Sequence, residues 1–201
     1  MLYLKQPQNE VTVMTYTVLN LNTVNLTDEQ FYRLCLANPD RQLELSATGE
    51  LIIMPPVGGI SGNREANLIT EVSLWNRQTN LGYVFSSSTI FRLPNGGQRS
   101  PDVAWVKRAK WDALTPDQQE KFPPLCPDFV IELPSRTDSL PVLQEKMNEY
   151  LNSGLQLGWL IDPQNQQVEI YRPNRAAEIV PFPAQLSGDP TLPGFTLDIR
   201  N

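Results

Sequence analysis

Short segments in which apolar residues dominate or alternate with polar ones recur along the chain. Such segments predict β-strands, because side chains of a strand point alternately to the two faces of a sheet. They lie at residues 42–46, 50–54, 82–85, 89–93, 102–106, 129–133, 159–161, 167–171, 178–180 and 195–199. Residues 47–49 and 162–166 have the composition of hairpin turns. A further alternating patch, Val11 to Val18, predicts a strand at a sheet edge or a subunit contact.

Three segments carry apolar residues at helical spacing instead. A helix is predicted from Thr27, a suitable N-cap residue, to about Asn38–Pro39. Longer helices are predicted over Arg64–Gln78 and Leu140–Asn152. The segment 107–122 is charged, and Thr115–Pro116 is a suitable helix start, so a helical insertion on the surface is predicted there.

The size of the chain favours one domain. Its 201 residues, 40% of them hydrophobic, suffice for one sizeable core, and no linker or repeat divides them. We therefore expect a single domain over residues 1–201, with 1–25 as an N-terminal extension. No apolar run is long enough to cross a bilayer, and residues 1–6 lack the order of a secretory signal, so a cytoplasmic protein without a membrane partner is expected. In that compartment Cys35 and Cys126 would be reduced thiols.

Histidine is absent from the sequence, which restricts the chemistry more than any other feature of composition. Catalysis by Ser-His-Asp or Cys-His and zinc sites with histidine ligands are excluded. Acid and base chemistry must come from carboxylates, lysine, tyrosine or a metal-bound water.

A net charge of −6 argues against a broad affinity for phosphate backbones. A local basic groove is still compatible with an acidic protein. Its candidate residues, which could equally be an ordinary solvated surface, are Arg92, Arg99, Lys107, Arg108, Lys110, Arg136 and Lys146.

Two of the predicted strands each carry one carboxylate among apolar residues, Asp102 and Glu132. A buried carboxylate is costly without a hydrogen bond, a cation or a metal. Mg²⁺ and Mn²⁺ prefer oxygen ligands and often take only one or two carboxylates. A lysine nearby, for which Lys146 is a candidate, could orient the attacking water or stabilise developing charge.

Each of these residues also has an ordinary structural interpretation. Asp102 could cap a turn or pair with Arg99, and Glu132 could form an ion pair with Arg136 or Lys146. Lys146 could be a solvated helix residue.

Four sequence blocks, in order, resemble the Uma-type family of endonucleases within the PD-(D/E)xK, restriction-endonuclease-like superfamily. The blocks are Arg99-Ser100-Pro101-Asp102-Val103-Ala104-Trp105-Val106, Pro127-Asp128-Phe129-Val130-Ile131-Glu132-Leu133, Leu143-Gln144-Glu145-Lys146-Met147-Asn148-Glu149-Tyr150 and Gly158-Trp159-Leu160-Ile161-Asp162-Pro163. The resemblance extends from about Leu26 to the end of the chain and includes 43–45, 49–51 and 193–198.

The resemblance implies an α/β (α+β) fold with a mixed central sheet flanked by helices and additional hairpins. It implies Asp102 and Glu132 as catalytic residues and metal ligands, Mg²⁺ or Mn²⁺ as cofactor, and Lys146 as the catalytic lysine. Pro134 occupies the position at which the superfamily usually has that lysine. Glu65 is the best candidate for an additional acid from an early helix. By the same analogy, a homodimer is expected.

The sequence departs from many relatives in lacking a histidine before the long helix, where it has Gly62-Asn63-Arg64. This difference removes a water-activating residue from that corner. Two hypotheses follow: a metal-dependent endonuclease that hydrolyses DNA phosphodiester bonds, or a non-catalytic nucleic-acid-binding or assembly module that keeps the nuclease fold. Tyr150 and Trp159 are interpreted as core residues in both.

Overall fold

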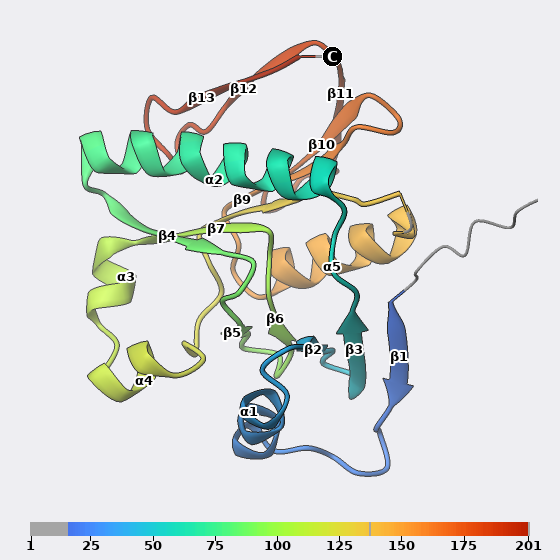
Figure 1. The fold of residues 1–201 in the computed structure, drawn as a ribbon. Coiled ribbons are helices and arrows are strands. Elements are labelled where there is room, and N and C mark those ends of the chain that lie inside the picture. The colour runs from blue at the N-terminus through green and yellow to red at the C-terminus, as the bar shows by residue number, and fades with distance from the viewer. Residues whose placement is uncertain (1–15, 137, 201) are drawn as a thin grey trace, which may run out of the picture.

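The computed structural model describes residues 16–136 and 138–200, and its central element is a six-stranded mixed sheet (Figure 1). The strand order is β11-β10-β9-β8-β7-β4. Only β8 and β9 pair in parallel. The strands are β4 Gly82–Ser86, β7 Val103–Lys107, β8 Phe129–Glu132, β9 Leu157–Asp162, β10 Gln167–Tyr171 and β11 Glu178–Pro181. The expected mixed sheet flanked by helices is confirmed.

The two faces of this sheet are covered by different elements. Helix α2 (Gly59–Thr79) packs on one face together with a hairpin of β12 (Ala184–Ser187) and β13 (Thr196–Ile199), and α5 (Leu140–Asn152) packs on the other. Val103 and Ile131 face α2, whereas Ala104 and Val130 face α5. Because side chains alternate along a strand, residues 102 and 132 are placed on the α5 face.

A second, five-stranded sheet has the order β1-β3-β2-β6-β5. Its strands are β1 Thr17–Asn20, β2 Gln42–Leu45, β3 Glu50–Met54, β5 Phe91–Arg92 and β6 Gln98–Arg99. Helix α1 (Asp28–Ala37) inserts Phe31 against Leu43 and Leu45 of this sheet. The helix begins as predicted. The Thr27 side chain accepts a hydrogen bond from the Gln30 N–H, and the Thr27 N–H donates to Oε1 of the Gln30 side chain. At the sheet edge, β1 leaves Val18 and Leu19 exposed.

Several element boundaries differ from the prediction. Helix α2 begins at Gly59, five residues before Arg64, with Gly58 in the extended N-cap conformation. The apolar pattern did not predict this start because the first turn of the helix has no buried apolar residue. The strand predicted at 89–93 is only Phe91–Arg92. The charged segment 107–122 forms two short helices, α3 (Arg108–Asp112) and α4 (Pro116–Glu120). Strand β12 was not predicted, since its regularity comes from pairing with β13.

Other expectations can be checked only in part. Positions 11–15 of the predicted Val11 to Val18 strand, and residues 1–6, lie outside the described residues. Cys35 and Cys126 are free thiols. In residues 16–136 and 138–200, no helix is both long and apolar enough to span a membrane.

Candidate active site

The candidate site lies where β7 begins and β8 ends. The two strands are antiparallel, with Val103 opposite Ile131, so continuing this register places Asp102 opposite Glu132. Asp102 is fixed by the backbone N–H of Leu133, which donates to its Oδ2 at 2.7 Å. The sheet therefore brings together the two carboxylates that the sequence singled out.

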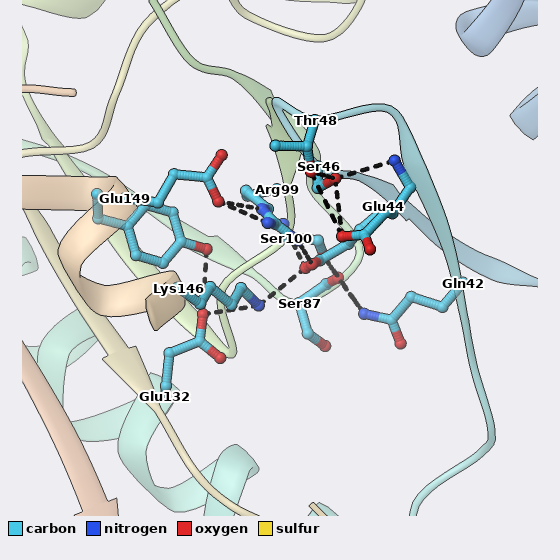
Figure 2. A network of polar contacts seen from close by, with 12 residues as sticks. Gln42, Glu44, Ser46, Thr48, Ser87, Arg99, Ser100, Glu132, Lys146 and Glu149 are labelled. Atoms are coloured by element: carbon cyan, nitrogen blue, oxygen red, sulfur yellow. Dashed lines mark hydrogen bonds and ion pairs between the residues drawn. The ribbon is translucent and has the colours of Figure 1, made fainter. Parts of the chain in front are cut away.

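Glu132 is buried and receives two side chains from α5. Lys146 Nζ lies 2.9 Å from Glu132 Oε1 (Figure 2). The Tyr150 hydroxyl donates to the same oxygen at 3.0 Å. The two donors lie one helical turn apart, which puts them on the same face of α5. Lys146 therefore belongs to the site, and Tyr150 is a buried hydrogen-bond donor as well as a core residue.

Lys146 also contacts a carboxylate that the sequence analysis did not select. Its Nζ lies 2.9 Å from Oε1 of Glu44 on β2, so the ammonium group sits between Glu44 and Glu132 (Figure 2). The Ser100 N–H donates to Glu44 Oε1 at 2.9 Å, and Arg99 Nη1 lies 3.1 Å from its Oε2. Glu44 alternates with Leu43 and Leu45, so it resembled the solvent-facing position of an amphipathic strand.

A second arginine–glutamate pair completes a buried group of charges. Arg99 is 8% exposed and contacts Glu149 of α5, with Nη2 2.6 Å from Oε2. Together with Asp102, this group comprises four carboxylates and two cations. Its net charge is −2 when all members are ionised, which one divalent cation would balance.

Burial and mutual repulsion act differently on the three carboxylates nearest Lys146. Burial raises the pKa of Asp102 well above its usual range, and the charge of Glu132 adds to this effect. Burial also raises the pKa of Glu132, although Lys146 opposes the shift. For Glu44, burial is outweighed by Lys146 and Arg99, and the pKa is lowered. Glu44 is therefore the firmly ionised partner of Lys146.

A cavity of about 470 Å³ opens onto these residues. Asp102, Glu132 and Lys146 line it together with Glu65 of α2 and the loop 55–59. The Ser87 hydroxyl donates to Glu65 Oε1 at 2.5 Å, and the charge of Glu65 contributes to the raised pKa of Asp102. All four residues predicted from the sequence thus face one cavity. We refer to it as the central cavity.

The carboxylates of the site fit a divalent cation with few protein ligands. One oxygen of each is held by the protein, whereas Asp102 Oδ1 and Glu132 Oε2 accept no hydrogen bond from the described residues. In the same part of the chain, the buried unpartnered side-chain atoms are Ser153 Oγ and Trp159 Nε1, so these two oxygens reach accessible space. Residues 16–136 and 138–200 contain no group of three or more acidic or cysteine side chains arranged for a metal. Two carboxylates with water and substrate oxygens are the arrangement that Mg²⁺ commonly takes.

The basic groove suggested by the sequence is not formed by its seven candidates. Arg99 and Lys146 are buried in ion pairs, and Arg92 and Lys110 pair with Asp28 and Asp128. Arg108 lies over the Tyr83 ring. Of the seven, only Arg136 and Lys146 line the central cavity. The suggested pairing of Asp102 with Arg99 is also wrong, because Arg99 contacts Glu44 and Glu149.

We expect Asp102→Asn to raise the free energy of unfolding of the metal-free protein at pH 8 by about 0.5–2 kcal/mol. The reason is that the buried charge of Asp102 destabilises the fold, as residues of functional sites often do. A carboxylate with a raised pKa destabilises the fold above that pKa and not below the pKa of the unfolded chain. Burial and Glu132 raise the pKa of Asp102, so the gain should shrink as the pH falls towards 4. Urea unfolding in EDTA at several pH values measures it, and an equal or lower stability of the variant at pH 8 would contradict it.

The comparisons with known proteins agree with this fold. A family model described as "Uma2: Putative restriction endonuclease" matches residues 28–200. The solved structure of "a putative nuclease belonging to DUF820" from Anabaena variabilis is similar, with a TM-score of 0.68 and 19% sequence identity. The similarity covers 78% of this chain and 86% of that one. The comparison with curated proteins gives no significant match. Because the family model spans most of the sequence, the chain belongs to the family described as "Uma2: Putative restriction endonuclease".

Proposed function

We propose that the protein is a metal-dependent endonuclease that hydrolyses phosphodiester bonds of DNA. The observation that carries this proposal is the placement of Asp102 opposite Glu132, each with one oxygen held and one oxygen open to the central cavity. Membership in a family described as restriction endonucleases supports the same reaction class.

The residues of the chain have distinct roles in this proposal. Asp102 and Glu132 would hold a divalent cation, with Asp102 Oδ1 and Glu132 Oε2 as the oxygens that no described residue engages. When bound, Mg²⁺ or Mn²⁺ lowers the pKa of a coordinated water and offsets negative charge on the phosphate. Lys146, held between Glu44 and Glu132, lines the central cavity, where it stabilises charge that develops on the phosphate or orients the attacking water. Glu65 of α2, which lines the same cavity, assists as an additional acid.

Removal of divalent cations should abolish cleavage. We expect labelled single-stranded, duplex or branched DNA to be cut in Mg²⁺ or Mn²⁺ and left intact in EDTA, with activity restored by added Mn²⁺. The physical reason is that the cation would supply an activated water and offset developing charge on the phosphate, which Asp102 and Glu132 cannot do without it. Gel analysis of end-labelled oligonucleotides measures the effect. Cleavage that persists unchanged in EDTA would contradict the metal requirement.

One observation favours a second function, a nucleic-acid-binding or assembly module without catalysis. Lys146 forms ion pairs with both Glu44 and Glu132, as it would in a network with a purely structural role. Isothermal titration with Mn²⁺ separates the two functions. Binding that is lost in Asp102→Ala supports the nuclease, whereas no binding, together with unchanged nucleic-acid affinity in that variant, supports the module.

A further inference from the structure

Three cavities share lining residues, and the candidate active site lies in the middle one. A cavity of about 640 Å³ beside α1 and β2 shares the lining residues Gln42, Met54, Pro55, Pro56, Ser87 and Ser100 with the central cavity. We call it the α1-side cavity. On the other side, a cavity of about 660 Å³ between α2 and the β12–β13 hairpin shares Leu133. We call it the α2-side cavity. We refer to the three cavities together as the path, whose middle part is lined by Asp102 and Glu132.

Each part of this path contains at least one exposed arginine. Arg41 lines the α1-side cavity, Arg136 the central one, and Arg64 and Arg200 the α2-side one. None of these four guanidinium groups forms an ion pair within residues 16–136 and 138–200. Arginine side chains without an acidic partner are free to form paired hydrogen bonds with phosphate oxygens.

The other cavity beside Lys146 differs in its charges. It has a volume of about 460 Å³ and is lined by Glu44, Glu50, Asp138, Glu145 and Glu149. Its two cations, Arg99 and Lys146, are buried and paired with carboxylates. That side therefore offers a polyanion no unpaired cation, whereas the path offers four arginines without an ion pair among the described residues.

We propose that the three adjoining cavities form a track for one strand of nucleic acid, whose phosphates contact Arg41, Arg136, Arg64 and Arg200. This inference rests on the proposed function, because it gives the route by which a phosphodiester reaches Asp102 and Glu132. The α1-side cavity is also lined by Asp40, the central cavity by Asp138, and the α2-side cavity by Glu71 and Asp198. These acids keep the affinity of the track moderate, in line with the net charge of −6.

The track predicts a defined salt dependence of binding. The probe is a fluorescein-labelled 20-nucleotide oligothymidylate, titrated with wild-type protein in EDTA so that metal-dependent cleavage does not interfere. Each contact to a single-stranded phosphate contributes about 0.7 to the slope of log affinity against log salt. Arg41→Gln, Arg64→Gln, Arg136→Gln and Arg200→Gln should each lower that slope by about 0.7 and the affinity about fivefold at 0.1 M salt. Fluorescence anisotropy measures both quantities.

Matched controls come from exposed arginines away from the track. Arg77 lies in the last turn of α2, and Arg175 lies in the turn between β10 and β11. Neither lines any of the three cavities, and neither forms an ion pair with a described residue. Arg77→Gln and Arg175→Gln remove the same charge and should leave the slope and the affinity unchanged.

The outcomes separate the track from the nuclease activity. Binding that depends on the four arginines, without cleavage in Mn²⁺, would support the track and contradict the proposed function. Cleavage together with equal effects of track and control variants overturns the track and keeps the proposed function. Absence of oligonucleotide binding by the wild-type protein also overturns the track, because the proposal requires the four arginines to bind the phosphates of a single strand.

Discussion

Replacing Asp102 with asparagine should lower the rate of DNA cleavage in Mn²⁺ by about three orders of magnitude or more, the scale seen when one member of a catalytic unit is lost. The Leu133 N–H can still donate to the amide oxygen, so the local backbone keeps its partner. What disappears is the negative charge that faces Glu132 across the two strands. The loss should therefore be in catalysis and metal affinity, not in folding.

Initial rates on an end-labelled oligonucleotide, with saturating Mn²⁺, measure this effect. Asp117→Asn is the matched control, because Asp117 is an exposed aspartate in the first turn of α4 that pairs only with Lys121. The control should cleave at the wild-type rate. If Asp102→Asn retains more than a tenth of the activity while wild type is active, Asp102 is not a metal ligand.

Lys146→Met should lower the free energy of unfolding by about 3–5 kcal/mol at neutral pH in EDTA, the cost of removing one partner from a buried ion pair. Methionine fills similar volume but leaves Glu44 and Glu132 facing each other without the ammonium group that each contacts at 2.9 Å. The loss should shrink as the pH falls, because buried carboxylates without a cation have raised pKa values, and their penalty vanishes once they are protonated.

Urea unfolding followed by circular dichroism at pH 7.5 and pH 4.5 gives the two free energies. Lys121→Met removes an exposed lysine that pairs with Asp117, and its urea midpoint should match that of wild type. A Lys146→Met protein as stable as wild type at pH 7.5 would show that Glu44 and Glu132 do not depend on the buried cation.

The parts of the fold that depend on local pattern were predictable. Capping residues such as Thr27 and Thr115 mark helix starts through hydrogen bonds within four residues, and both helices begin there. The strands of the main sheet carry apolar runs long enough to recognise. The start of α2 at Gly59 was missed because its first turn has no buried residue. Strand β12 was missed because its alternation of apolar and polar residues spans only Ala184–Ser187, and its pairing with β13 is not visible in the local sequence.

The candidate site was predictable to the extent that its residues interrupt apolar strands. Asp102 and Glu132 stand out because a carboxylate in a buried strand needs compensation, and the family resemblance indicated Lys146. Glu44 and Arg99 could not be found this way. Their strands belong to the second sheet, and the distance between Glu44 and Lys146 along the chain, 102 residues, leaves no local signal for their contact.

The buried group of charges has a consequence for how the molecule unfolds. Glu44 and Arg99 belong to the second sheet, whereas Glu132 and Lys146 belong to the main sheet and its helix α5. If the second sheet opened alone, Lys146 and Glu149 would each lose a partner while still largely enclosed. Partial opening is therefore penalised, and the two sheets should separate from each other only in the same cooperative event that unfolds the domain.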